Sequence, residues 1–306
     1  MLEMLIVMEP TVVVANLASS QNRSRRVNRL LFWLMILISN AYTATQLIAQ
    51  NEENVSAEKV APLVNAYAEN DYTQKRPLMN AIELGYRYIE ADTFLVDEVL
   101  MIGYSVLDMQ SKGSLETLYF APLKKLVDEG SDFIKGSDSP LHLVIDIKSE
   151  PLLSYRALRI LLGKYASMLT KVVDGQVHPG AITVVVSGNC ARESIAAENP
   201  RYAAIDGRIT DIDSDIPTHL IPMISARWGS HFRWLGNSEF TKTEQLRLKA
   251  IVDRAHAKNR VIRFWSTPDV DLVWTTLRLS EVDLLGAEQY SKLSEFLVPR
   301  KSPFDP

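Results

Sequence analysis

The chain has little of three things that would narrow its function at once: cysteine, net charge and long apolar runs. Cys190 is the single cysteine among 306 residues, so no disulfide can form within the chain. The formal net charge is -4 and the one basic run lies near the N-terminus, which argues against a nucleic-acid partner. No apolar stretch approaches the roughly 20 residues of a membrane-spanning helix. With 47% hydrophobic and 23% charged residues, the chain has the composition of ordinary globular material.

The basic run begins a segment that is typical of an export signal. Four arginines precede a short apolar core, Leu30–Ile38, and the small residues Ser39-Asn40-Ala41 follow it. This order predicts cleavage and export to the periplasm or the extracellular space, with an uncleaved N-terminal membrane anchor as the alternative. Residues 1–21 precede the arginines, although such signals normally begin close to the initiator methionine. The true translation start therefore stays open. The predicted parts are a leader (1–44), a polar linker (45–58), a domain (59–298) and a tail (299–306).

Past the linker, short apolar or β-branched runs alternate with amphipathic helical stretches. The candidate strands are Lys59–Tyr67, Tyr86–Val96 with a hairpin arm at Val99–Tyr104, Leu141–Ile147, Ala181–Ser187, Tyr202–Asp206, Leu220–Ser225, Arg260–Ser266 and Val282–Leu285. The clearest helices are Leu152–Leu169 and Thr241–Lys258. No glycine-rich phosphate loop follows the first strand, which disfavours a doubly wound sheet. The pattern predicts a single-domain α/β fold, a (β/α)8 TIM barrel, with its chemistry at the C-terminal strand ends.

Two pairs of polar residues lie at these strand ends. Glu90 and Asp92 are two residues apart, and so are Asp146 and Lys148 on the next strand. Side chains alternate faces along a strand, so the barrel interior would gather three carboxylates and an ammonium group. Neighbouring carboxylates raise one another's pKa unless a cation lies between them. The pattern predicts a hard divalent cation, Mg²⁺ or Ca²⁺, with Glu90, Asp92 and Asp146 as ligands.

The alternative for these residues is an internal ion-pair network. Asp146 would then pair with Lys148, and Glu90 would pair with Arg87 or Arg263. Carboxylate oxygens that converge on one centre would favour the cation site, whereas carboxylates paired with Lys148 and Arg263 would favour the network.

The succession of motifs resembles a known family. In order, these motifs are NDYTQKRPLMNAIELGYRYIEADTFLVDEVLMIGYSVLD, SLETLYFAPL, LVIDIKSE, ITVVVSGN, YAAIDGR and VIRFWSTPD. Over about residues 64–297 they are similar to the phosphatidylinositol phospholipase C-like phosphodiesterases. The similarity is to the branch that contains altered inheritance of mitochondria protein 6 and its bacterial relatives, with glycerophosphodiester phosphodiesterases further away.

This resemblance implies a TIM barrel that hydrolyses a phosphodiester in a lipid or a glycerophosphodiester headgroup. A divalent cation would be bound by Glu90, Asp92 and Asp146, and Lys148 would contact the phosphate. Two histidines would transfer protons, one from the nucleophile and the other to the leaving alkoxide.

The chain departs from the family where those histidines belong. Relatives read His-x-His-Asn-Asp-Tyr where this chain reads YAENDY, and Gly-His-Asp where it reads GYS, so Tyr67, Glu69 and Tyr104 replace histidines. Glu69 is a candidate base or fourth cation ligand. Tyr104, a phenol with an ordinary pKa of about 10, can donate a proton but is a poor base at neutral pH. The turn after the last strand also differs and reads GAE at 286–288.

Other residues near the mouth are candidates for ligand binding. The candidate substrate-binding residues are Lys148, Asn70, Arg263 and Trp265. Arg263 can reach a phosphate or close a buried ion pair. Trp228, Phe232, Trp234 and Trp265 can hold an apolar part of a ligand or simply pack against one another. Of five histidines, His231 alone is expected on the catalytic side.

The sequence therefore supports a phosphodiesterase-family protein whose hydrolysis of phosphoric diesters is weak, altered or absent. Its ligand would be a phosphodiester, a phosphorylated small molecule or a lipid headgroup. The alternative is an inactive relative that binds a cation and a phosphorylated ligand or a protein partner. A third hypothesis is a metal-free barrel whose acidic network serves an interaction surface.

Overall fold

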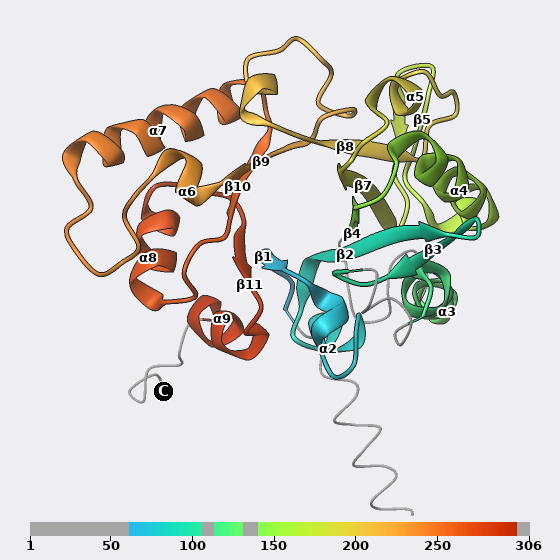
Figure 1. The fold of residues 1–306 in the computed structure, drawn as a ribbon, viewed down its shortest axis with the longest axis horizontal. Coiled ribbons are helices and arrows are strands. Elements are labelled where there is room, and N and C mark those ends of the chain that lie inside the picture. The colour runs from blue at the N-terminus through green and yellow to red at the C-terminus, as the bar shows by residue number, and fades with distance from the viewer. Residues whose placement is uncertain (1–60, 106–112, 131–139, 299–306) are drawn as a thin grey trace, which may run out of the picture. The chain divides into compact units, whose positions relative to one another are not determined.

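The computed structural model describes residues 61–105, 113–130 and 140–298, and within these ranges eight parallel strands surround one interior (Figure 1). The strands are β1 (Leu63–Ala68), β2 (Tyr86–Val96), β4 (Leu141–Ile147), β7 (Ile182–Gly188), β8 (Ala203–Gly207), β9 (Met223–Arg227), β10 (Val261–Trp265) and β11 (Leu285–Ala287). The predicted leader, linker and C-terminal tail lie outside the described residues.

Strand pairing produces a nearly closed barrel. The strands follow the order β10-β9-β8-β7-β4-β2-β1-β11, and each neighbouring pair is parallel. An isolated parallel bridge from Arg263 on β10 to Leu284 joins the two ends of this order. The register places Asp92 opposite Asp146, and Asp146 opposite Ser187. The predicted TIM-barrel fold is confirmed, and its register brings polar strand ends to one rim.

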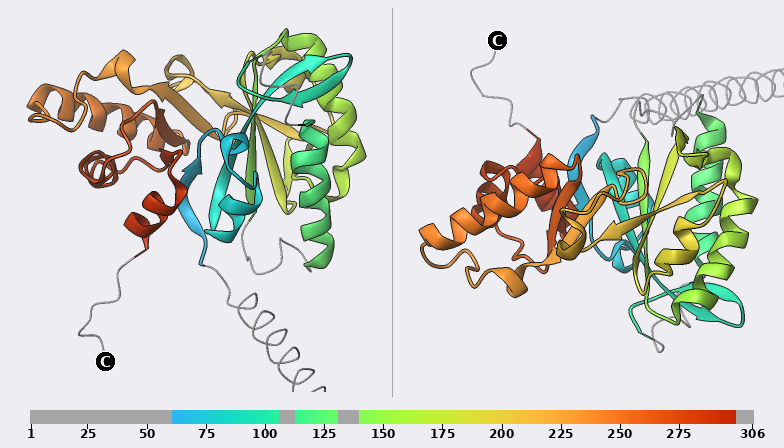
Figure 2. Two further views of the ribbon diagram at one scale, coloured as in Figure 1. Left: turned by 60° about the horizontal axis from the view of Figure 1, so that its bottom comes forward. Right: turned by 90° about the horizontal axis from the view of Figure 1, so that it is seen from above.

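Helices cover the outside of the strand ring, as Figures 1 and 2 show. They are α2 (Met79–Glu83), α3 (Ala121–Glu129), α4 (Pro151–Lys164), α5 (Arg192–Ala196), α6 (Trp228–His231), α7 (Lys242–Ala257), α8 (Asp271–Leu279) and α9 (Tyr290–Leu297). Side chains cap the two longest: Glu150 accepts hydrogen bonds from the first backbone N–H groups of α4, and Thr241 does the same for α7. Such caps satisfy N–H groups that have no partner within the helix.

Strand alternation divides the apolar residues into two clusters. On β4, Leu143 and Ile145 belong to the large cluster between strands and helices, whereas Val144 belongs to a small cluster inside the barrel. The inner cluster consists of Tyr67, Val144, Val185, Ala204, Met223 and Leu284. Asp146 follows Val144 on the same face, so the inner cluster forms the floor beneath the polar strand ends.

Several element boundaries differ from the predicted ones. The strand predicted from Leu220 begins at Met223, because Pro222 has no N–H to donate to a neighbouring strand. The last strand begins at Leu285 instead of Val282. Sequence reasoning expected the arm β3 (Val99–Ile102) but missed the separate hairpin of β5 (Lys171–Val173) and β6 (Gln176–His178). Among the described helices, none combines the length and apolar character needed to cross a bilayer.

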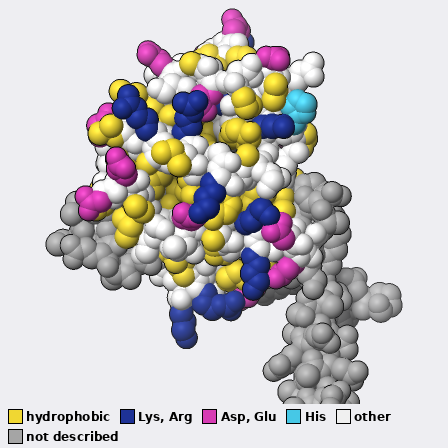
Figure 3. Space-filling view, turned by 90° about the vertical axis from the view of Figure 1, so that its right-hand side faces the viewer, with side chains coloured by type: hydrophobic (Ala, Val, Ile, Leu, Met, Phe, Trp, Pro, Cys, Tyr) yellow, Lys and Arg dark blue, Asp and Glu magenta, His cyan; other side chains and the backbone are white. Residues whose placement is uncertain are grey.

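Charges of both signs share the described surface. On the face drawn in Figure 3, basic and acidic side chains are interspersed with apolar ones. Ion pairs such as Arg159 with Glu198 (2.9 Å) and Lys164 with Glu116 (2.5 Å) join neighbouring segments. A largely exposed pair such as Lys164 with Glu116 contributes little to stability. The mixture of basic and acidic side chains agrees with the small net charge of the chain.

Candidate functional site

A cavity of about 1220 Å³ opens at the C-terminal ends of the strands. It is lined by side chains from strand ends and from the loops that follow them, including every predicted cation ligand and every predicted substrate-binding residue. In TIM-barrel enzymes, this end of the barrel carries the chemistry. The cavity is therefore the candidate active site.

Three carboxylates converge in this cavity. Glu90, Asp92 and Asp146 each offer one oxygen, and these oxygens all lie within 4.8 Å of one another. Asp92 is 2% exposed, and one oxygen of Asp146 (Oδ1) is buried without a hydrogen-bond partner in the described structure. Gly188 lies so close that a β-carbon there would collide with this oxygen. The convergence that the sequence predicted is present.

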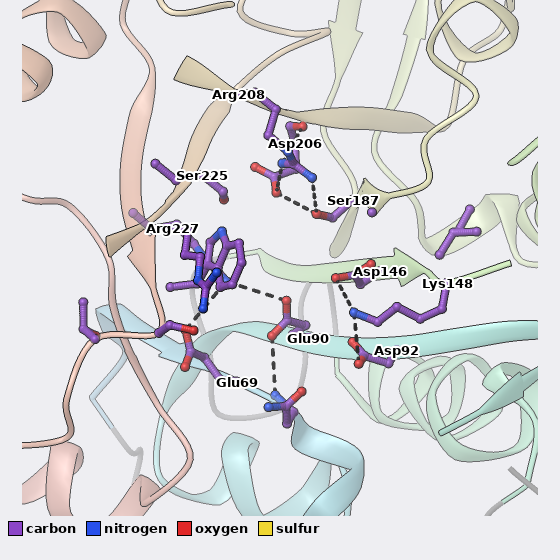
Figure 4. Close-up of a pocket in the computed structure, with 18 of the residues that line it drawn as sticks. Glu69, Glu90, Asp92, Asp146, Lys148, Ser187, Asp206, Arg208, Ser225 and Arg227 are labelled. Carbon is purple, nitrogen blue, oxygen red and sulfur yellow. Dashed lines mark hydrogen bonds and ion pairs between the residues drawn. The ribbon is translucent and has the colours of Figure 1, made fainter. Parts of the chain in front are cut away.

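Lys148 lies between two of these carboxylates (Figure 4). Its ammonium nitrogen is 2.8 Å from Asp146 Oδ2 and 3.2 Å from Asp92 Oδ2. The predicted ion-pair network is therefore present alongside the predicted convergence, and the two alternatives are not exclusive. Because Oδ1 of Asp146 and the oxygens of Glu90 make no contact with Lys148, the cluster keeps more negative charge than one ammonium group balances.

The cluster shifts the pKa values of its members. Burial raises the pKa of Asp92 to about 7, with the neighbouring Glu90 charge adding to the effect. Burial also raises the pKa of Glu90, while Arg263 opposes the rise. Burial alone would lower the pKa of Lys148, but the carboxylates of Asp146 and Asp92 outweigh it and raise that pKa. An additional cation stabilises the ionised form of such buried carboxylates, whose pKa values are raised, more than that of exposed ones.

The loop after β1 holds the carboxylates from one side. The Tyr72 hydroxyl lies 2.9 Å from Asp92 Oδ2 and 3.0 Å from Asn70 Oδ1. The backbone N–H of Asn70 donates to Glu90 (3.4 Å), and its side-chain amide donates to Glu288 (2.7 Å). Asn70, predicted to bind substrate, thus also orients a cluster carboxylate.

Arg263 on β10 is buried and lines the cavity. Its guanidinium carbon lies 3.6 Å from the ring centroid of Tyr67. One terminal nitrogen is 3.6 Å from Glu69 Oε1 and 3.7 Å from Glu90 Oε1. Arg263 is 5% exposed, and Nε and Nη1 have no hydrogen-bond partner in the described structure. The pairing of Glu90 with Arg263, one of the two arginines expected, is thus present, and two carboxylates share one guanidinium.

Glu69 fits beside Arg263 because Gly286 on β11 has no side chain. A β-carbon on Gly286 would collide with the Glu69 carboxylate. Burial raises the pKa of Glu69 to about 7, although Arg263 opposes the rise. A carboxyl group with such a pKa can accept or donate a proton near neutrality. Glu69 therefore has a titration range suited to proton transfer, but it is held by an arginine.

The remaining predicted residues are divided between the cavity and the core. Tyr104 (71% exposed), Trp265 (38% exposed) and His231 line the cavity. Tyr67, expected at the mouth as a replaced histidine, is instead buried in the inner cluster beneath Arg263. Packing is the correct interpretation for the other aromatic candidates, which are buried against one another: Trp228, Phe232 and Trp234.

Sequence reasoning assigned no role to a polar wall at the C-terminal ends of β7, β8 and β9. The wall residues are Ser187, Asp206, Arg208, Ser225 and Arg227. The signal was present, because Asp206 and Arg208 are two residues apart at a strand end, as Glu90 and Asp92 are.

The cluster fits a divalent cation. The donor set is three carboxylates, the ligand type that Mg²⁺ and Ca²⁺ prefer. Oδ1 of Asp146 is buried and lacks a partner, and Gly188 leaves open the space in front of it. Glu90, Asp92 and Asp146 would hold the ion, with Tyr72 and Asn70 orienting two of them.

Comparisons with known proteins found a matching family model and several similar chains. The model of a family described as "AIM6-like phosphodiesterase domain" matches residues 54–206. An altered inheritance of mitochondria protein 6 homolog from Arthroderma benhamiae is 26% identical, over 74% of this chain and 81% of the relative. The Eremothecium gossypii protein of that name is 23% identical, over 78% and 70%. A calcium-dependent phosphoinositol-specific phospholipase C from Pseudomonas sp aligns with TM-score 0.43 and 11% identity, over 77% of this chain and 93% of its own.

Proposed function

The chain belongs to the AIM6-like phosphodiesterase domain family, and on that premise we propose that it binds a divalent cation and a phosphodiester in the barrel mouth. We propose further that it hydrolyses the diester slowly or not at all. The observation that carries this proposal is the convergence of Glu90, Asp92 and Asp146 beside Lys148, in a cavity whose single imidazole belongs to His231 among the described residues. On this proposal the site would bind cation and phosphate, while its described lining offers no pair of histidines for proton transfer.

The chain's own residues would divide the binding as follows. Mg²⁺ or Ca²⁺ held by the three carboxylates would supply positive charge to a phosphate oxygen. Lys148, released from Asp92 and Asp146, would place its ammonium group against a second phosphate oxygen. A diester bound in this way is polarised and oriented, so the binding part of catalysis is retained.

Proton transfer is the weak part of the site. Glu69 is held by Arg263, and Tyr104 is a largely exposed phenol. A positioned general acid or base contributes about 10²–10⁴ in rate, so a site in which neither group is well placed would turn over several orders of magnitude more slowly. The raised pKa of Glu69 supports a slow residual hydrolysis in which Glu69 acts as the general base.

Asp146→Asn is expected to weaken Mg²⁺ or Ca²⁺ binding by at least about 100-fold, because it removes a charged oxygen ligand with no other partner. Isothermal titration calorimetry of the metal alone measures this effect. Asp253→Asn is the matched control, since Asp253 is an exposed carboxylate on α7 that pairs with Lys249. Equal cation affinity in the wild type and in both variants would contradict the proposed cation site.

Lys148→Met is expected to tighten cation binding by about tenfold, because the ammonium group competes with the cation for Asp92 and Asp146. The same variant should bind a phosphodiester more weakly. Calorimetric titrations of cation, and then of diester into cation-loaded protein, measure the two effects. Weaker cation binding in this variant would mean that Lys148 supports the carboxylate geometry instead of competing for it.

A further inference from the structure

One buried carboxylate beside the cavity has no part in the chemistry proposed above. Asp71 lies in the turn that follows β1 (Asp71–Thr73), and it is 0% exposed. Its neighbours Asn70 and Tyr72 line the cavity, whereas the Asp71 side chain is buried in the core. A buried carboxylate costs stability unless other groups donate hydrogen bonds to it. The groups that surround Asp71 therefore indicate what it does.

Donors from three parts of the chain meet at Asp71. Its Oδ2 accepts hydrogen bonds from the backbone N–H of Leu78 (2.5 Å) and from the hydroxyl of Tyr119 (2.9 Å). The Tyr290 hydroxyl lies 3.3 Å from Asp71 Oδ1 and 3.0 Å from the backbone oxygen of Glu69. Tyr119 lies in the helical turn before α3, and Tyr290 begins α9. Asp71 thus ties the loop after β1 to two elements that come later in the chain.

The backbone of this loop has unusual conformations at Asn70 and Leu78. Asn70 has a φ of +48°, and Leu78 has a φ of +64°. Such angles cost free energy in a residue other than glycine and persist only where the surrounding structure holds them. Leu78 is held because its side chain is buried and its N–H donates to Asp71. Without the Asp71 carboxylate, the loop would lose a constraint on its conformation.

The same loop contacts the carboxylate cluster from the other side. The backbone N–H of Asn70 donates to Glu90 (3.4 Å), and the Tyr72 hydroxyl donates to Asp92 (2.9 Å). These two donors flank Asp71 in the sequence, so a shift of the turn would move both of them. Removing a group that orients a metal ligand typically costs about 10–100-fold in metal affinity.

We propose that Asp71 is a positioning residue for the cation site. It fixes the turn that carries Asn70 and Tyr72, and through their hydrogen bonds it sets the orientation of two cluster carboxylates. This inference rests on the proposed function, because it requires the cation site. It extends that site to a buried carboxylate that is itself not a cation ligand.

Asp71→Asn is expected to weaken Mg²⁺ binding about tenfold, because an amide has only one oxygen for the donors that meet there. Calorimetric titration of Mg²⁺ into the full chain measures this loss. Tyr119→Phe removes one donor and keeps the carboxylate, so it should weaken Mg²⁺ binding about threefold. This milder variant provides the test if Asp71→Asn does not fold. Unchanged Mg²⁺ affinity in the folded variants would overturn the inference.

A double-variant cycle separates positioning from a simple loss of negative charge. Tyr72→Phe removes a donor that Asp71 is proposed to position, and it should weaken Mg²⁺ binding about tenfold by itself. If Asp71 acts through the turn, Asp71→Asn/Tyr72→Phe should bind Mg²⁺ only about 10–30 times more weakly than the wild type, because the two losses overlap. A long-range attraction between Asp71 and the cation would give independent losses of about 100-fold together, which would overturn the positioning role.

Arg201→Met is the matched control for stability. Arg201 is also buried, and it makes hydrogen bonds to Ala203 and His219. It precedes β8 and so lies at the end of that strand away from the cavity. This variant should lower the thermal midpoint of the cation-free protein, as Asp71→Asn does, without changing Mg²⁺ affinity. A matching loss of Mg²⁺ affinity in Arg201→Met would mean that affinity follows general stability, and it would overturn the positioning role.

Failure of the proposed function gives a different result from failure of this inference. A wild type that binds no Mg²⁺ would overturn the cation site, and the role of Asp71 with it. A wild type that binds Mg²⁺, with the same affinity in Asp71→Asn, would overturn the role of Asp71 and leave the cation site intact.

Discussion

The double variant Glu69→His/Tyr104→His is expected to hydrolyse an alkyl phosphodiester about 10²–10⁴ times faster than the wild type, in a cation-dependent manner. Glu69 and Tyr104 line the cavity that contains the carboxylates and Lys148, so an imidazole at either position would face the bound diester. Histidine has an ordinary pKa of about 6.5 and can take or give a proton at neutral pH. The gain would come from restoring proton transfer to a site that already binds.

Two substrates separate the roles of the introduced imidazoles. The leaving group of an aryl diester is a stable phenolate, which needs little help from a general acid. The leaving group of an alkyl diester is an alkoxide, which needs a proton from a general acid. The double variant should therefore improve the alkyl diester more than the aryl diester. Glu69→Gln/Tyr104→Phe is the matched control and should give no gain. A folded, cation-binding double variant with no gain on either diester would refute the account.

Arg263→Met is expected to lower the free energy of unfolding by about 3–5 kcal/mol, because it leaves the buried carboxylates of Glu69 and Glu90 without their shared cation. It also removes the guanidinium from the face of the Tyr67 ring. Urea unfolding measures the loss. Arg254→Met, which breaks an exposed ion pair with Asp213, should leave the urea midpoint nearly unchanged.

A second substitution tests the cause of that loss. Adding Glu69→Gln to Arg263→Met removes one of the two unbalanced charges, so the double variant should recover part of the lost stability. If the double variant is no more stable than Arg263→Met alone, the loss comes from packing around the guanidinium and not from charge.

The barrel could be predicted from sequence because the alternation of side chains along each strand, and of strands with helices, is visible over short stretches of sequence. Alternation along β4 places Val144 and Asp146 on one face and Leu143 and Ile145 on the other, which is visible in the letters alone. The same alternation identified Glu90, Asp92 and Asp146. Parallel strands of one barrel end at the same rim, so their convergence followed from the fold.

What could not be predicted depends on contacts between distant strands. The sequence shows Glu69 in place of a histidine and glycine at position 286 as separate departures from the family, but in the structure they are one feature. Gly286 leaves the space that the Glu69 carboxylate fills, and Arg263 from a third strand pairs with that carboxylate. Tyr67 lies beneath this group, a depth that a strand-end position alone does not reveal.

Phosphorus-31 NMR of a glycerophosphodiester tests the central claim most directly, because one spectrum reports both binding and hydrolysis. With Mg²⁺, the diester resonance should broaden or shift, and chelator should reverse the change. A monoester resonance should grow no faster than about 0.1 turnovers per second, which is a typical enzyme rate reduced by loss of proton transfer. A diester resonance indifferent to Mg²⁺, or a monoester growing at about 10 turnovers per second, would contradict a barrel that binds but scarcely hydrolyses.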